Sequence, residues 1–539
     1  MTSKTFIALL SLSLFCSNSA YSQKHKVSFG DKQKVSKADG RTPGPILGGT
    51  ENGSYQLRYQ YNYTFLLFFT LVKVNPMLAL LDAESMSLKW SKPILTKEDL
   101  PEDIRVPESY SSLEVVGDKI FAAFNRYDAK SKTFEVYAFY LNAQGKKMGK
   151  VTRIHREKVN NWTGVGDVDI VFSEDKKHFL FFYKEESGRK EEESYTFKIF
   201  TQDLELAHTR EVTFPVQDRY FLFNQIALAN DKEVYISSSV YDDEENNNDG
   251  KRKKRVKSKT GSWVIHLFSF RMDEETEGEI KDLELNLKSR YVTSARFKLT
   301  DERVIASGFY GKKPGTVNGV VSLIYDREKD EIIRDDMEEL PASTLADFGK
   351  SSQKAGKLSA NNMFIKDLSI SKDGSYYMLG EQYYVVEVTR TSSNGFIYTD
   401  YYYHYNDLLL TKVDPNGDIA WSHRVGKKSY TRIENNLGYG CYMHHNKETD
   451  MVYLVFNDNP DNFKLIQDGK FKTTTYGSSH VVSVNVSPDG KMTKTLLWNN
   501  KEKKLLFHPE LSSQVSAASA FLACQRGRNS STVTVTFAQ

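Results

Sequence analysis

The chain has little cysteine, little proline and little excess of either charge. Its 539 residues include 3 Cys and 13 Pro, and 73 Lys and Arg residues nearly balance 70 Asp and Glu residues, for a net charge of +3. A disulfide-stapled scaffold needs many more cysteines. A nucleic-acid-binding protein concentrates positive charge on one face or helix, whereas basic and acidic residues are mixed here almost everywhere. We therefore exclude the first class and expect no nucleic acid as a partner.

Long hydrophobic runs are also scarce. The two longest are FIALLSLSLFC (6–16) and TFLLFFTLVKV (64–74), each of eleven residues. A helix that spans a bilayer needs about 20 apolar residues, so neither run is long enough. We expect the second run to be a buried strand and the mature chain to be soluble, without a transmembrane helix.

The N-terminus predicts a secretory signal peptide over residues 1–22. Lys4 supplies the positive charge before the apolar run, and Ala20-Tyr21-Ser22 offers small residues for cleavage before Gln23. Cys16 raises lipidation as an alternative, although the bulky residue before it fits that processing poorly. We therefore expect an exported protein, located in the periplasm, associated with the outer membrane or outside the cell.

Two cysteines remain after cleavage at that site, Cys441 and Cys524. One disulfide is conceivable in an oxidising compartment. Because two cysteines in so long a chain do not make a disulfide framework, we favour two small buried residues.

What the chain does have is aromatic residues, 32 Phe and 31 Tyr, in a repeated pattern. Tyr and Phe favour strands. A phrase of apolar alternation, tight turn and aromatic strand occurs six times, at 113–124, 168–183, 225–240, 295–310, 366–381 and 442–458. The turns carry Asp118, Asp175, Asp231, Asp301, Asp373 and Asp450, which lie 56 to 77 residues apart. Each copy predicts an antiparallel hairpin.

A second hairpin phrase alternates with the first. Its clearest copy is DLLLTKVDPNGDIAWSHRV (407–425), where Asp414-Pro415-Asn416-Gly417 fits a tight turn and Trp421 would cover a gap between sheets. Other copies are at 78–90, 139–151, 195–214, 263–285, 319–335 and 483–498. Two hairpins per repeat make a four-stranded antiparallel sheet.

Sheets of this kind, repeated at this period, predict an all-β fold, a β-propeller of four-stranded antiparallel blades. Six internal copies plus one composite blade, built from N-terminal strands within 54–90 and the C-terminal hairpin 519–537, make seven blades; six or eight remain open. We expect one propeller domain over residues 54–539 after a flexible N-terminal segment, 23–53. Residues 340–360 predict a crossing with a short helix, and residues 241–261 a disordered loop between the two hairpins of one blade.

Sequence motifs for catalysis or metal binding are lacking. His444 and His445 are adjacent, so on a strand they point to opposite faces, and we expect them at the surface or rim. Zinc-binding spacings, a nucleophile elbow and phosphate-binding loops are not found, and NDNPDN (457–462) does not match a calcium loop. We predict no cofactor, no metal and no catalytic residue. A propeller enzyme would need carboxylates or histidines clustered on the channel face.

The best candidate for binding is a tyrosine-rich segment, GEQYYVVEVTRTSSNGFIYTDYYYHYND (380–407). An exposed tyrosine offers both apolar area and a hydroxyl, which suits recognition of a protein or a glycan. The alternative is that most of these rings pack between blades. The predicted binding residues are Glu381, Gln382, Tyr383, Tyr384 and Tyr402, completed by Asn457, Asp458 and Asn462 on the loop of the next copy.

Residues 365–465, approximately, resemble a block in poorly characterised exported proteins of Bacteroidota. The resemblance rests on an acidic-Gln-Tyr-Tyr phrase, a Tyr-Asn-Asp phrase and a Gly-x-Ile-x-Trp hairpin, all present here in GEQYY, YNDLLLTKVDPNGDIAWSHRVGKK and the following YLVFNDNPDN. Gly426-Lys427-Lys428-Ser429 departs from the usual Lys-then-Gln ending. The resemblance implies no reaction; it implies a role like that of accessory subunits of outer-membrane export or surface machinery.

These observations together predict an exported, non-catalytic β-propeller scaffold that binds another cell-envelope protein, in peripheral association with the outer membrane. Two other function classes stay open. One is a propeller enzyme that processes glycans or peptides, and the other is a glycan-binding module.

Overall fold

The computed structural model describes residues 25–538 apart from 35–41, 51–52, 66–69, 83–84, 103, 108, 160–167, 185–189, 243–261, 273–278, 286–289, 314, 349–359, 434–437, 476 and 528. The predicted signal peptide, with Cys16, lies outside the described residues. So does the predicted loop 241–261 except for its first two residues, which end a strand.

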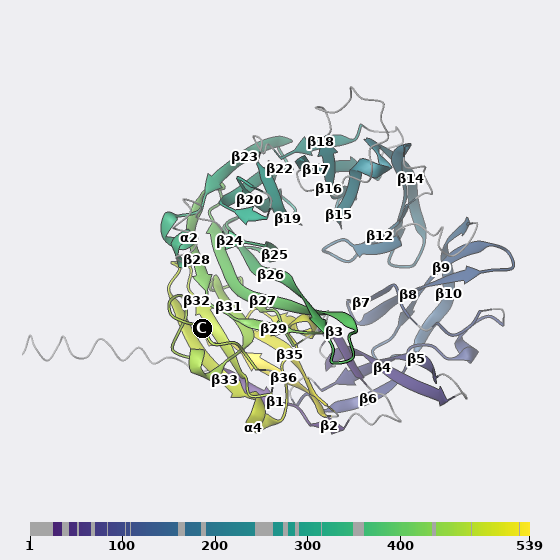
Figure 1. The fold of residues 1–539 in the computed structure, drawn as a ribbon. Coiled ribbons are helices and arrows are strands. Elements are labelled where there is room, and N and C mark those ends of the chain that lie inside the picture. Colours follow the sequence, from purple (N-terminus) through teal and green to yellow (C-terminus); the bar gives the residue numbers. More distant parts are fainter. Residues whose placement is uncertain are drawn as a thin grey trace, which may run out of the picture.

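Eight antiparallel sheets, each with a path of four strands, make up most of the described chain and follow one another around a ring (Figure 1). We number these blades 1 to 8. Blade 1 holds β3 (Thr42–Thr50), β4 (Gly53–Phe65), β5 (Thr70–Leu81) and β6 (Leu88–Pro93). Blade 2 holds β7 (Ser112–Val116), β8 (Lys119–Asp128), β9 (Thr133–Leu141) and β10 (Lys147–Lys158). Blade 3 holds β11 (Val168–Phe172), β12 (His178–Lys184), β13 (Glu192–Thr201) and β14 (Leu206–Gln217).

The remaining blades follow the same order. Blade 4 holds β15 (Phe221–Leu228), β16 (Glu233–Asp242), β17 (Ser262–Arg271) and β18 (Lys281–Glu284), and blade 5 holds β19 (Tyr291–Leu299), β20 (Arg303–Gly311), β22 (Gly319–Asp326) and β23 (Glu331–Glu339). Blade 6 holds β25 (Met363–Ile370), β26 (Tyr376–Thr391), β27 (Ile397–Val413) and β28 (Ile419–Val425), and blade 7 holds β30 (Tyr442–Asn446), β31 (Met451–Asp458), β32 (His480–Val486) and β33 (Met492–Asn499). Blade 8 orders β34 (Ser513–Ser516), β35 (Ser519–Arg526), β36 (Asn529–Thr536) and β1 (Lys26–Phe29).

Short elements complete the chain. The strands β2 (Gln33–Lys34) and β29 (Ser429–Thr431) add to blades 8 and 6, while β21 (Thr316–Val317) and β24 (Ala360–Asn361) pair with each other. The helices are α2 (Ala342–Asp347), α4 (Asn500–Lys503), η1 (Lys97–Asp99), η3 (Asp218–Tyr220), η5 (Pro460–Asn462) and η6 (Pro509–Leu511). None of the helices in the described residues has the length and apolar character needed to cross a membrane.

The repeated hairpins were predicted correctly. All six copies of the first phrase form the first two strands of blades 2 to 7, and the second phrase forms the outer hairpin of blades 1 to 7. The turn at 414–417 closes with a bond from the Gly417 amide to the Asp414 carbonyl (3.0 Å), and Gly417 has φ +95°, the left-handed conformation that glycine adopts without strain. Trp421 packs between blades 6 and 7, as expected.

One apolar cluster lies between each pair of neighbouring blades, which explains why the sheets form a ring. Between blades 2 and 3, for example, the rings of Phe121 and Phe179 are 5.0 Å apart. The cluster between blades 8 and 1 is the smallest and holds Ile46, Leu81, Met86 and Phe521. Because every blade buries both faces against neighbours, the eight clusters close the circle, and the fold is a β-propeller.

The predicted count of seven blades was one too low. The N-terminal strands and the C-terminal hairpin were assigned to one composite blade, but blade 1 is complete by itself and blade 8 takes β1 as its outer strand. The segment 23–53, predicted to be flexible, therefore contributes β1 and β3. The strand β3 (TPGPILGGT) escaped notice because proline and glycine are rare inside strands, but one edge of an innermost strand has no neighbour in its own sheet and tolerates proline.

The apolar run 64–74 is not one buried strand. Phe65, the last residue of β4, pairs with Thr70, the first residue of β5, so the chain reverses direction within this run. The predicted helix in the 340–360 crossing is confirmed by α2. Both described cysteines, Cys441 and Cys524, are buried and free, as favoured.

Candidate functional site

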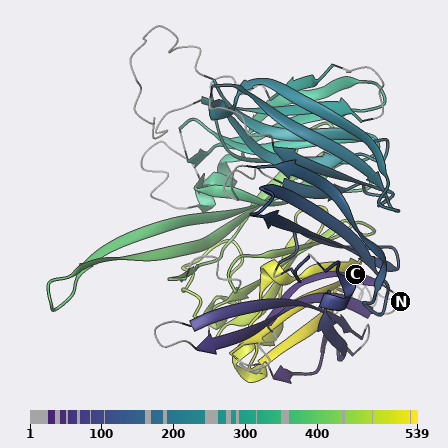
Figure 2. The same cartoon turned by 90° about the vertical axis from the view of Figure 1, so that its right-hand side faces the viewer.

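The most unusual element is a two-stranded arm in blade 6. The strands β26 and β27 have 16 and 17 residues, and their far ends project well beyond the body of the ring (Figure 2). The paired register continues from Tyr376 opposite Val413 to Thr391 opposite Ile397. At the tip the Ser392 amide donates to the Phe396 carbonyl (2.8 Å), and Gly395 takes φ +77°. We call residues 385–402 the arm.

The tip of the arm is apolar and exposed. Phe396 and Ile397 have 75% and 74% of their surfaces accessible to solvent. Val385, Val386, Tyr398 and Tyr401 are also among the exposed hydrophobic residues. An isolated pair of strands is barely stable in water. Large apolar side chains exposed on such a ribbon do not stabilise it, so their presence indicates a site of interaction.

The three predicted tyrosines lie at the root of the arm and along it, and side chains of the ribbon and of adjacent segments leave them half-buried. Tyr384 stacks on His404 with ring centroids 4.6 Å apart, and Tyr383 lies 5.1 Å from Tyr405. The Tyr402 hydroxyl accepts hydrogen bonds from Arg390 and Arg432 at 2.9 and 2.8 Å. Cross-strand ring pairs of this kind stabilise an antiparallel ribbon. The tyrosines therefore stiffen the arm and leave part of their surface accessible.

Glu381 is buried, which differs from the exposed surface predicted for it. Its carboxylate lies 2.7 Å from the Lys427 ammonium, and both side chains are almost fully enclosed. A register shift separates Glu381 from Tyr383, so Gln382, which is half-buried, sits at a β-bulge where the arm leaves the blade. Close to Glu381, the thiol of Cys441 is also buried, and this burial raises its pKa.

Asn457, Asp458 and Asn462 are buried too, and they do not complete an exposed surface with the tyrosines. Asp458 accepts from Lys494 (2.6 Å) and from the Asn462 amide (2.8 Å). Asn457 donates to the Gly438 and Phe507 carbonyls at 2.9 and 2.8 Å. These bonds hold the loop after β31 against the blade, because buried polar groups must find partners.

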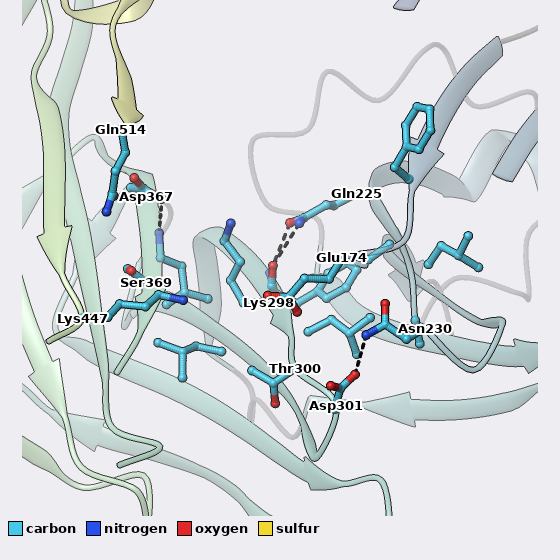
Figure 3. A pocket seen from close by; sticks show the side chains of 18 residues that line it. Glu174, Gln225, Asn230, Lys298, Thr300, Asp301, Asp367, Ser369, Lys447 and Gln514 are labelled. Atoms are coloured by element: carbon cyan, nitrogen blue, oxygen red, sulfur yellow. Dashed lines mark hydrogen bonds between the residues drawn. The ribbon is translucent and has the colours of Figure 1, made fainter. Parts of the chain in front are cut away.

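A cavity of about 500 Å³ lies among the innermost strands of several blades, and Figure 3 shows the side chains that line it. It is lined by the first strands of blades 3 to 6, with contributions from the first turn of blade 7 and from β34 of blade 8. The wall is partly fixed by polar bonds: Gln225 bonds to both backbone groups of Phe297, and Asn230 donates to Asp301 at 2.8 Å. The ionisable residues on the wall are Glu174, Lys298, Asp301, Asp367 and Lys447.

Asp367 is the most perturbed acid on this wall. Burial raises the pKa of its carboxyl group, against the opposing effects of Lys298, of the Leu368 amide that donates to it (2.8 Å), of Arg296 and of His445. Because the folded protein holds this proton more tightly than the unfolded chain, ionisation of Asp367 opposes folding as the pH rises through the folded pKa.

We therefore expect Asp367→Asn to raise the melting temperature at pH 7. The asparagine oxygen can still accept a hydrogen bond from the Leu368 amide, and the cost of a half-buried carboxylate is gone. The gain should shrink as the pH falls towards about 4, where the aspartate of the unfolded chain becomes protonated. Thermal unfolding across pH 4–8 measures this, with Asp301→Asn, an exposed acid on the same cavity, as the control that should change little. A stabilisation that does not depend on pH would contradict the explanation.

The histidines are not at the surface or rim, contrary to the prediction. His444 and His445 are both buried, and they do point in different directions, since His444 bonds to the Ala517 carbonyl (2.8 Å) while His445 bonds to Ser369 (2.8 Å) and Asp450 (3.0 Å). No group of three potential metal-ligating side chains occurs among the described residues. Ser369 and the tip residues Phe396 and Ile397 were not singled out from the sequence; the Ser-Ser-Asn-Gly turn between two long alternating strands was the signal for the tip.

Comparisons with known proteins find only distant structural similarity. No family model matches the chain, and no curated protein matches it. Similar solved structures include the WD40 domain of SCAP from fission yeast (TM-score 0.42, 10% identity, 96% of each chain covered) and the Dos1 propeller (TM-score 0.39, 8% identity, 94% of each chain). The polysaccharide lyase Uly1 also matches, with a TM-score of 0.37, 8% identity and coverage of 95% of this chain and 99% of that one. Similarity this distant does not transfer a function.

Proposed function

We propose that this β-propeller is an exported scaffold that binds another protein of the cell envelope through its arm. The main support for this proposal is the ribbon of residues 385–402, which leaves the ring (Figure 2) and carries the exposed side chains of Phe396 and Ile397 at its tip. A partner that covers these side chains removes a large apolar area from water, which drives protein association.

The charge of the arm favours a protein as the occupant. Between residues 385 and 402 the ionisable groups that carry charge at neutral pH are Glu387, Arg390 and Asp400, and the last two pair with each other at 2.9 Å. Such a ribbon offers no positive field for a nucleic acid or an anionic headgroup. An apolar pocket or groove on a partner protein fits the tip, with the tyrosines on the ribbon supplying hydroxyls at the margin.

The strand edges of the arm give a partner a second means of attachment. The strand β25 pairs with β26 only as far as Gln382, and β29 pairs with β27 only at residues 403–405. Within the arm, residues 385–391 of β26 and 397–402 of β27 each have one edge that pairs with no other strand among the described residues. An extended segment of the partner can therefore add to the ribbon as a further strand.

A photo-crosslinking amino acid at position 396 tests the proposal in cells. We expect one envelope protein to be captured from position 396, and the same amino acid at Leu206, an exposed apolar site on blade 3, to capture none. The double variant Phe396→Ser with Ile397→Ser should weaken binding of the purified partner at least about 30-fold, because such side chains are typical energetic centres of an interface. Its melting temperature should equal that of the wild type.

Two outcomes would contradict partner binding through the arm. One is equal capture from positions 396 and 206. The other is a double serine variant that retains the affinity of the wild type for the captured protein. A fall in melting temperature would show instead that the tip packs on the ring.

A further inference from the structure

A serine, a histidine and an aspartate form a continuous hydrogen-bonded chain beside the axial cavity. The Ser369 hydroxyl lies 2.8 Å from His445 Nδ1, and His445 Nε2 lies 3.0 Å from Asp450 Oδ1. Ser369 is on β25 of blade 6, the strand that faces the axis, and it lines the cavity (Figure 3). His445 lies on β30 of blade 7, and Asp450 is in the turn that follows. The chain thus crosses the interface between two blades and ends at the cavity.

The aspartate is held in place and ionised. Burial would raise the pKa of Asp450, but hydrogen bonds from His445, Lys412, Ser371 and Tyr377 outweigh it and hold the pKa well below its usual range. The Lys412 ammonium and the Ser371 hydroxyl each lie 2.6 Å from the carboxylate, and the Tyr377 hydroxyl lies 2.9 Å away. A fixed carboxylate orients the imidazole and stabilises the positive charge that it acquires on accepting a proton.

The surroundings of His445 fix the orientation of its imidazole. His445 is buried, and the edge of its ring meets the Tyr377 ring at 67° with centroids 5.0 Å apart. It presents Nδ1 to the serine and Nε2 to the carboxylate. Either ring nitrogen of a histidine can carry the mobile proton, so this orientation allows the ring to act as a general base towards the hydroxyl.

We propose that Ser369 is a nucleophile that hydrolyses small carboxylic esters in the axial cavity, with His445 as general acid and base and Asp450 as its positioning residue. The Ser369 oxygen attacks the ester carbonyl carbon and gives its proton to His445 Nδ1. The carbon–oxygen bond to the leaving group breaks as His445 returns that proton to the alkoxide, which departs as an alcohol. Water then attacks the acyl-serine and gives one proton to His445. The bond between the acyl group and Ser369 breaks, a carboxylic acid leaves, and His445 passes the proton to the Ser369 oxygen.

The cavity limits the kind of ester. A volume of about 500 Å³ is at the small end of ligand sites, so it admits a small acyl compound and excludes a folded protein. Lys298 and Lys447 line the same cavity and bring positive charge to it, which favours an oxyanion formed there. This activity is separate from partner binding by the arm, and either can fail without the other.

Hydrolysis of p-nitrophenyl acetate and labelling by a fluorophosphonate, both on the mature full chain, test the proposal. We expect mass spectrometry to place the label on Ser369, Ser369→Ala to abolish labelling and hydrolysis above background, and His445→Ala to slow both at least about 100-fold. Ser483→Ala is the matched control, because Ser483 is a buried serine of blade 7 that bonds to Asn485 (2.7 Å) and contacts no histidine in the part of the chain that the structure describes. It should label like the wild type.

Mass spectrometry of the labelled wild type locates the reactive residue without any variant. The test therefore still decides the question if the His445 variant folds poorly. Absence of labelling in the folded wild type, a label on another residue, or labelling that survives Ser369→Ala would overturn the proposal. In each of those cases the serine, histidine and aspartate serve only to hold blades 6 and 7 together.

Discussion

Replacing Asp458 by alanine is expected to lower the free energy of unfolding by about 3–5 kcal/mol, the usual cost of removing one member of a buried ion pair. The Asp458 side chain is 0% exposed and that of Lys494 is 3% exposed, with 2.6 Å between carboxylate and ammonium. The substitution leaves the ammonium with the backbone carbonyls of Asn462 and Leu465 as its hydrogen-bond acceptors among the described residues. Neutral carbonyls do not compensate a buried charge.

Chemical denaturation of the variant and the wild type measures this loss. The matched control is Asp489→Ala in the same blade, where the Lys491–Asp489 pair is almost as short, at 2.7 Å, but its side chains are 85% and 55% exposed. Exposed pairs contribute little, so the control should unfold almost like the wild type. The double variant Asp458→Leu with Lys494→Met should recover much of the loss, because it removes both charges. Equal losses for Asp458→Ala and Asp489→Ala would contradict the role assigned to burial.

Removing residues 1–34 is expected to open the ring. The deletion takes away β1, whose four residues pair with Val533 to Thr536 of β36, and with it the ring of Phe29, which lies 5.5 Å from Trp498. It also removes His25, which bonds to Asn485 at 3.0 Å. Loss of the two partly buried apolar side chains of β1, Val27 and Phe29, and of the strand pairing should cost about 2–4 kcal/mol. The exposed edge of β36 should also promote aggregation.

Thermal unfolding and light scattering measure the two effects. A chain that begins at His25 retains β1 and is the control, so its melting temperature should equal that of the mature protein. Adding a peptide of residues 25–34 should raise the melting temperature of the shortened chain, since the peptide can occupy the free edge. If the shortened chain melts with the control and stays monomeric, β1 does not close the ring.

The hairpins could be predicted from the sequence because each is a local event. Alternating apolar residues and a turn rich in Asp, Asn and Gly specify two paired strands without help from distant residues. Blade 1 was missed because β3 carries Pro43, Pro45 and three glycines, a composition that is usual in loops. Its position next to the axis permits it, and that position is a property of the closed ring.

The candidate sites depended on partners from distant parts of the chain, and the sequence does not display these. Asn457, Asp458 and Asn462 look like a solvated loop until Lys494 and Asn500 are placed beside them. Ser369 and His445 belong to no known motif, because 76 residues separate them and they meet across two blades. The sequence did indicate the tyrosines at the root of the arm and along it. The arm leaves the ring because its two strands are longer than the blade, and this length and the exposed Phe396 at the tip were not predicted.

The pairing of Lys26 with Thr536 has a consequence for how the protein reaches its final form. These residues lie more than 500 positions apart in the chain, so their contact carries a high loop-closure cost. The strand β1 therefore stays without its partner until β36 is available to pair with it. A factor that covers β1 before it pairs with β36 would change the yield of folded protein and leave the folded structure itself unchanged.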